Sequence, residues 1–157
     1  MSRAERLVVF GIGSRLMRDD GIGPVLADRL QKEPHPGNWL ICAAETDIAY
    51  AAGLRLPGDY VVLLDAVQAG NAPGTVYMVE LQTGEWRKRR PASLHEPDAW
   101  QLVFEQPHSG GCLIGVEASD ISPGIGLGPV LANAYESIYG RVKALLDKIT
   151  QAHLKIG

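Results

Sequence analysis

Three side chains in this sequence have the types and positions for metal-dependent chemistry: Asp20, Asp65 and His95. Asp20 follows a short apolar run and a glycine turn, and Asp65 comes directly after another buried run. If these runs are neighbouring parallel strands, both carboxylates emerge at the same edge of the sheet. Two oxygens and one imidazole, from His95 at a predicted helix start, would leave coordination positions open, which is typical of a working metal site. This ligand set suits zinc, manganese, iron or nickel and does not select among them.

The acidic pair Asp19 and Asp20 has a simpler alternative interpretation. A helix is predicted to begin at about residue 20 or 21, with Pro24 near its start, so both acids could serve only as caps at its positive end. Taken alone, a histidine at a helix entry is more often a surface residue. A dinucleotide-binding loop is excluded, because Leu16 stands where the third glycine belongs. The His-Glu-x-x-His and Gly-x-Ser-x-Gly patterns of known hydrolases are also missing from the sequence.

The elements that must position these residues are predicted from apolar periodicity. Strands are predicted over residues 7–10, 39–43, 60–64, 75–81 and 112–116. Four helices are predicted: one over residues 22–32, one that follows residues 45–47 and ends at about residue 55, one that begins at about residue 97, and one that begins at residue 129. The third and fourth strands are joined by only about ten residues, too few for a parallel crossover. We therefore expect one α/β domain over residues 1–157 with a mixed five-stranded sheet. Its core is expected to contain Phe10, Leu26, Val62, Leu64, Ile114, Ile138 and Leu145.

The composition excludes several classes of function. The net charge of −3 gives no general attraction to nucleic acid or to an anionic membrane surface. No apolar run reaches the roughly 18 residues of a membrane span, and the N-terminal residues lead into the first strand without a signal segment. Cys42 and Cys112 lie in apolar runs without a catalytic signature, and are expected to be reduced core thiols of a cytoplasmic protein. The basic run over residues 87–90 is interpreted as a solvated loop or as a contact to an acidic protein.

Several segments together match a known pattern. The opening one, Gly11-Ile-Gly13-Ser-Arg-Leu-Met-Arg-Asp19-Asp20-Gly-Ile-Gly23, is similar to a G-x-G-N loop followed by an acidic pair and a glycine. The shorter ones, in order, are Leu64-Asp65-Ala66, Pro73-Gly74-Thr75, Ser93-Leu94-His95, and the stretch from Gly115 through Gly126 to Pro129. In this order and spacing, the segments resemble the endopeptidases that mature [NiFe] hydrogenases, over nearly the whole length of the chain.

This resemblance implies a three-layer α/β/α sandwich around a five-stranded sheet. It also implies that Asp20, Asp65 and His95 contact nickel, and that the nickel belongs to the substrate. In the family, that substrate is the hydrogenase large-subunit precursor, whose C-terminal extension is removed once the metal is loaded. The expected protein is a monomeric endopeptidase. Its free form should bind nickel weakly, because no thiolate is among the three ligands.

Two alternatives use the same residues. The first is a non-catalytic protein that checks or escorts nickel during hydrogenase assembly, and the second is a metal-dependent hydrolase of small substrates. The sequence discriminates poorly among the three, because each requires the same ligands.

The sequence departs from the family pattern at two places. Ser14 stands where the family has asparagine, but a serine hydroxyl can also bond to the turn backbone, so little loss is expected. After the second predicted strand, many members carry Asp-Gly-Gly-Thr, whereas this chain has Cys42-Ala43-Ala44-Glu45-Thr46. Because this loop borders the predicted metal edge, Glu45, Thr46 and Asp47 are expected to bind the substrate and to influence which large subunit is recognised.

Overall fold

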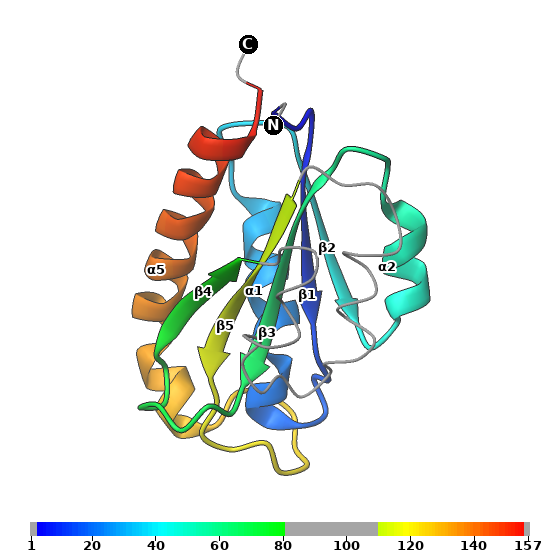
Figure 1. The fold of residues 1–157 in the computed structure, drawn as a ribbon. Helices are drawn as coiled ribbons and strands as arrows, with labels where there is room; N and C mark the ends of the chain where they lie inside the picture. The colour runs from blue at the N-terminus through cyan, green and yellow to red at the C-terminus, as the bar shows by residue number, and fades with distance from the viewer. Residues whose placement is uncertain (1–2, 81–109, 156–157) are drawn as a thin grey trace.

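The structure is a computed structural model that describes residues 3–80 and 110–155. Its central element is a mixed β-sheet. Within these residues, five strands pair in the order β2-β1-β3-β5-β4 (Figure 1). Strands β1, β2, β3 and β5 are parallel, and β4 runs antiparallel to β5 at one edge. The expected mixed five-stranded sheet is therefore confirmed. The strand bounds are Leu7–Ile12 (β1), Trp39–Glu45 (β2), Tyr60–Val67 (β3), Val76–Glu80 (β4) and Gly110–Glu117 (β5).

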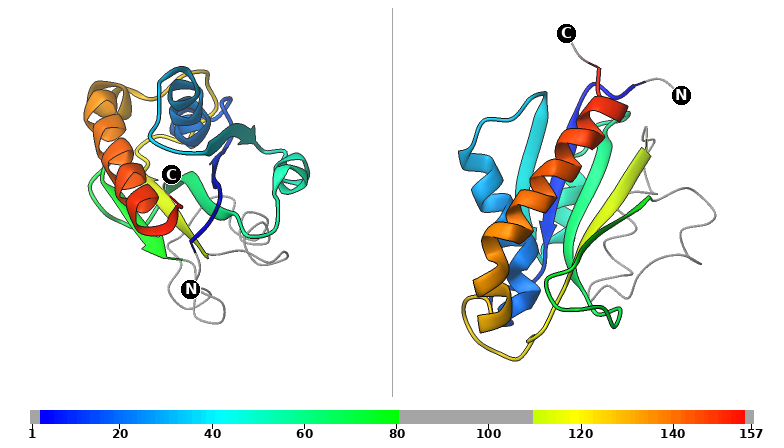
Figure 2. Two further views of the ribbon diagram at one scale, coloured as in Figure 1. Left: turned by 90° about the horizontal axis from the view of Figure 1, so that it is seen from above. Right: turned by 90° about the vertical axis from the view of Figure 1, so that its left-hand side faces the viewer.

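The helices cover both faces of this sheet, which confirms the expected three layers. Helices α1 (Ile22–Lys32) and α5 (Pro129–His153) lie on one face, and α2 (Ile48–Leu54) lies on the other (Figure 2). A short 3₁₀ helix, η1 (Arg18–Gly21), joins β1 to α1. The helix predicted from about residue 97 lies outside the described residues. Within the described part of the chain, no helix combines the length and the hydropathy that crossing a bilayer requires.

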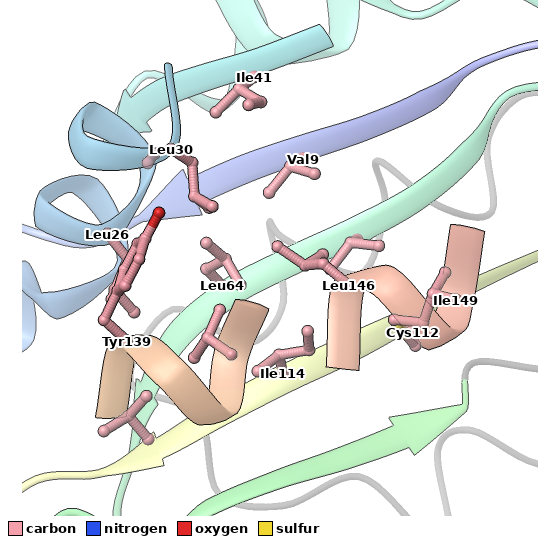
Figure 3. Packing of buried hydrophobic residues seen from close by; sticks show 14 of the residues in the cluster. Val9, Leu26, Leu30, Ile41, Leu64, Cys112, Ile114, Tyr139, Leu146 and Ile149 are labelled. Atoms are coloured by element: carbon pink, nitrogen blue, oxygen red, sulfur yellow. The ribbon is translucent and has the colours of Figure 1, made fainter. Parts of the chain in front are cut away.

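Alternation along the strands divides the core between the two faces. Val62, Leu64 and Ile114 pack under α1 and α5, with Leu26 and Ile138. Figure 3 shows Leu26, Leu64 and Ile114 in this cluster. Phe10 points to the opposite face, toward α2. Six of the seven predicted core residues are buried. The seventh, Leu145, is only half-buried at the margin of the α5 stripe, whose centre is formed by Ile138, Val142, Leu146 and Ile149.

Strand β3 is longer than the sequence predicts, so Asp65 lies inside the strand and not directly after it. Residues 65–67 continue the parallel pairing with β5, where Asp65 lies opposite Gly115 and Val67 lies opposite Glu117. On its other side, β3 pairs with β1 up to the pair Gly11 and Leu64. The end of β1 therefore lies beside the Asp65 segment.

The start of α1 lies close against the backbone of β1 and β3. An added Cβ on Gly23 would lie 2.3 Å from the Leu64 carbonyl oxygen and 2.5 Å from that of Ile12. We expect Gly23→Ala to lower the free energy of unfolding by about 1–3 kcal/mol, because backbone atoms of two strands must move. Urea unfolding followed by circular dichroism measures this loss.

The matched control for this substitution is Gly53→Ala in α2. No atom lies within 4 Å of a Cβ added at Gly53. Alanine is the better helix former, so this variant should be neutral or more stable by up to about 1 kcal/mol. Equal unfolding midpoints for the two variants would contradict the tight contact at Gly23.

Candidate functional site

The carboxyl ends of β1 and β3 bring Asp20 and Asp65 to the same edge of the sheet. After β1 the chain turns at Gly13, and η1, which carries Asp20, lies against β3, the strand of Asp65. Both side chains are buried, with exposed fractions of 4% for Asp20 and 1% for Asp65. The parallel pairing of β1 and β3, on which the predicted site depends, is therefore present. Figure 1 shows this edge at the lower end of the sheet, away from the two termini.

The glycine turn after β1 encloses Asp20. The backbone N–H of Ser14 donates to Asp20 Oδ2 at 2.9 Å. Gly13 has a φ of +136°, and an added Cβ there would lie 1.9 Å from the Asp20 carbonyl oxygen, so only glycine fits. The Ser14 hydroxyl accepts from the Leu16 N–H at 3.2 Å. The expectation that serine also bonds to the turn backbone is therefore confirmed.

Asp19 has a different role from its neighbour. Its side chain is fully buried, and its carboxylate accepts from the backbone N–H groups of Ser119, Asp120 and Gly128 at 2.9, 2.7 and 2.8 Å. The N-cap of α1 is Gly21. The alternative in which the acidic pair caps this helix is therefore wrong. Asp19 instead joins η1 to the loop between β5 and α5.

Glu117 is a buried acid at the same edge that the sequence reasoning did not single out. It ends β5, and its carboxylate accepts from the Tyr77 hydroxyl at 2.6 Å and from the backbone N–H groups of Ala69 and Asn71. Burial, together with the hydrogen bond to Glu117, raises the pKa of Tyr77 to about 12, so its hydroxyl stays protonated and donates. The signal that identified Asp65, an acid at the end of a buried run, applies equally to Glu117.

The loop predicted to bind substrate lies beside the glycine turn. The Gly13 N–H donates to the Glu45 carbonyl oxygen at 3.0 Å. Strand β2 extends to Glu45, whose carboxylate accepts from Arg15 Nε at 2.6 Å. Asp47 caps α2 by accepting from the Tyr50 N–H at 3.0 Å. The two acids therefore have structural partners, while Glu45, Thr46 and Asp47 are all exposed at this edge. Their contact with substrate remains a prediction.

The third predicted ligand, His95, lies outside the described residues, as does the basic run over residues 87–90. Among residues 3–80 and 110–155, no three side chains of His, Cys, Asp or Glu gather closely enough to hold a metal ion. The described part of the site therefore supplies the carboxylates of Asp20 and Asp65. Such oxygens suit a hard or borderline cation and are compatible with nickel.

Neither cysteine is prepared for nucleophilic catalysis. Cys112 is fully buried, and this burial is the main reason why the pKa of its thiol is raised to about 12. Burial also raises the pKa of the half-buried Cys42. A thiolate is the reactive form of cysteine, and a raised pKa disfavours this form at both positions. The interpretation as a core thiol holds for Cys112, whereas Cys42 is half-buried and packs against the margin of the core.

Several known proteins with a similar sequence or fold are named as hydrogenase maturation proteases. No family model matches the chain. In sequence, the chain is 32% identical over 77 residues to the hydrogenase 3 maturation protease of Escherichia coli (strain K12). This alignment covers 46% of the chain and 47% of that protein, so the chain matches only about half the length of this curated relative.

Solved structures extend the comparison to nearly the whole fold. The hydrogenase maturating endopeptidase HybD from E. coli matches with a TM-score of 0.71 and 23% identity, over 91% of this chain and 93% of that one. The [NiFe] hydrogenase maturation protease HybD from Thermococcus kodakarensis matches with a TM-score of 0.69 and 21% identity, over 89% and 98%. The chain therefore resembles the [NiFe] hydrogenase maturation endopeptidases in sequence over about half of its length, and it has their α/β fold.

Proposed function

We propose that this protein is an endopeptidase that removes the C-terminal extension of a nickel-loaded [NiFe] hydrogenase large-subunit precursor in the cytoplasm. The observation that carries the proposal is the position of Asp20 and Asp65. Both residues are buried at the edge where β1 ends beside the last residues of β3. The fold that places them there is shared with structures named as hydrogenase maturation proteases.

In this proposal the nickel arrives with the substrate. Asp20, Asp65 and His95 complete the coordination of an ion that the precursor already holds. Three ligands without a thiolate bind nickel weakly on their own, so the free enzyme carries little metal. Once bound between the two proteins, the ion can polarise a scissile carbonyl or a water molecule.

The exposed loop beside the glycine turn is proposed to contact the precursor. Glu45, Thr46 and Asp47 project at the edge that holds Asp20. The bonds from Arg15 to Glu45 and from Tyr50 to Asp47 fix the loop before any substrate arrives. A loop held in this way loses little conformational freedom on binding, which favours discrimination among precursors.

The experiment is incubation of the protein with a nickel-loaded large-subunit precursor, followed by intact mass spectrometry. Loss of a mass equal to the C-terminal extension is the expected result. A stable complex with an unchanged precursor mass would contradict cleavage and would assign the protein as a nickel-checking or escort protein. Hydrolysis of model esters or short peptides, with the precursor left intact, would identify a small-substrate hydrolase.

A further inference from the structure

We propose that Asp19 is a positioning residue, which holds η1 against the loop of residues 118–128 and thereby places the Asp20 carboxylate. This inference rests on the proposed function, because Asp20 matters only if it takes part in the reaction. The two neighbouring acids would then have different roles in the site. Asp20 faces the substrate-borne metal, and Asp19 orients the short helix that carries it.

The Asp19 carboxylate is the centre of the junction between these segments. Its Oδ2 accepts from Ser119 and Asp120, and its Oδ1 accepts from Gly128, the N-cap residue of α5. Its own backbone N–H donates to the Asp120 carbonyl oxygen at 2.9 Å. An ionised carboxylate is an acceptor only, so it can receive all three N–H groups without a mismatch. An asparagine would turn an NH₂ group toward at least one backbone donor.

A second set of contacts fixes the same two segments next to the carboxylate. Met17 and Gly124 form a parallel β-bridge, in which Gly124 donates to the Leu16 carbonyl oxygen and the Arg18 N–H donates to that of Gly124. Arg18, the first residue of η1, has a φ of +46°, a conformation that a residue with a side chain adopts only at a cost. The junction therefore holds η1 in a backbone path that this segment would not adopt alone.

The consequence for Asp20 follows from the length of η1. The helix is only four residues long, so a shift at Asp19 is transmitted directly to the next residue. The Ser14 N–H, from the glycine turn, donates to Asp20 Oδ2. The Asp19 junction holds the adjacent residue of η1 from the loop between β5 and α5.

The structure offers a matched control at the opposite end of the sheet. Asp59 is also a buried carboxylate with three hydrogen bonds, from Arg6 Nε, Arg6 Nη2 and the Leu56 N–H. It precedes the first residue of β3, whereas the candidate site lies near the last residues of that strand. A general loss of stability should therefore be similar for Asp19→Asn and Asp59→Asn, and a loss of positioning should occur only in the first.

The test compares kcat and KM for cleavage of nickel-loaded precursor by wild type, Asp19→Asn and Asp59→Asn. We expect kcat to fall by about 10- to 100-fold in Asp19→Asn, as for residues that orient metal ligands, with KM changed less than about threefold. Asp59→Asn should keep the kcat of wild type at a temperature where both variants are folded. An unchanged kcat in Asp19→Asn, or an equal loss in Asp59→Asn, would overturn the proposal.

Hydrogen exchange keeps the inference separate from the proposed function. If wild type cleaves no precursor, the proposed function fails, but the junction can still be measured. The amides of Ser119, Asp120 and Gly128 should exchange at least about tenfold faster in Asp19→Asn, with β1 and β3 unchanged. Faster exchange throughout the sheet would contradict a local role.

A second variant tests the junction if Asp19→Asn does not fold. Gly124→Ala disturbs the same junction, because the added Cβ would lie against the Arg18 side chain, and it should lower kcat in the same way. An unchanged kcat in Gly124→Ala would also overturn the proposal.

Discussion

Replacing Asp20 by asparagine is expected to reduce cleavage of the nickel-loaded precursor by at least about 100-fold while the fold is retained. Partners that only orient metal ligands cost about 10- to 100-fold when they are removed, so loss of a ligand should cost at least as much. Asparagine has nearly the same shape and still offers an oxygen to the Ser14 N–H, which now donates to Asp20 Oδ2. Intact mass spectrometry of the precursor measures cleavage, and circular dichroism checks the fold.

A surface aspartate from the same region is the matched control for this substitution. Asp28 lies on α1, is substantially exposed and bonds to Arg15, so Asp28→Asn should leave cleavage within about twofold of wild type, as is usual for exposed ion pairs. Asp20→Glu should keep partial activity, since its carboxylate survives on a longer side chain. His95→Ala should be as inactive as Asp20→Asn. Full activity of Asp20→Asn or of His95→Ala would refute the proposed ligand set.

Nickel-free precursor is expected to be cleaved at least about 100 times more slowly than nickel-loaded precursor. If the ligands of the enzyme complete the coordination of a substrate-borne ion, the apo precursor lacks that part of the binding free energy. A 100-fold difference corresponds to about 2.8 kcal/mol, which is modest for an interaction that includes metal–ligand bonds. Parallel time courses with the two forms of the precursor, each read by intact mass, measure the ratio.

The control for this experiment concerns the enzyme alone. Treatment with a chelator should leave its melting temperature unchanged, because the fold does not depend on a resident metal in this proposal. A large drop in melting temperature would show that the protein holds a structural metal of its own. Cleavage of both precursor forms at the same rate would refute the idea that nickel controls recognition.

The strands and the main helices could be predicted because their signals are local. Four apolar residues before a glycine turn mark β1, and Pro24 marks the first turn of α1, which begins at Ile22 as predicted. The end of β3 could not be located, since the pairing of residues 65–67 depends on β5, about 50 residues away. The packing of α5 is also a long-range property. The angle at which α5 crosses the sheet determines that Leu146 is more buried than its neighbour Leu145.

The candidate site shows the same limit at the level of single side chains. The sequence brings Asp20 and Asp65 to one edge because Asp20 follows β1 and Asp65 lies near the end of β3, which pairs with β1 in parallel. It does not distinguish Asp19 from Asp20, because the partners of Asp19 are backbone groups in a distant loop. Nor does it show that Glu45 bonds to Arg15, since exposed acids are usually solvated. Contacts with residues that are distant in the sequence determine which of several similar acids has a structural role.

The partners of Asp19 also determine when the site can form during synthesis. Ser119 and Gly128 follow Asp19 by 100 and 109 residues. At about 5–20 residues per second, a ribosome needs roughly 5–20 s to add the first 100 of them. Until then η1 has no junction to hold it, and a nascent or truncated chain cannot orient Asp20. In this proposal, a chain that stops before residue 119 lacks every partner of the Asp19 carboxylate, so it should be inert toward hydrogenase precursors.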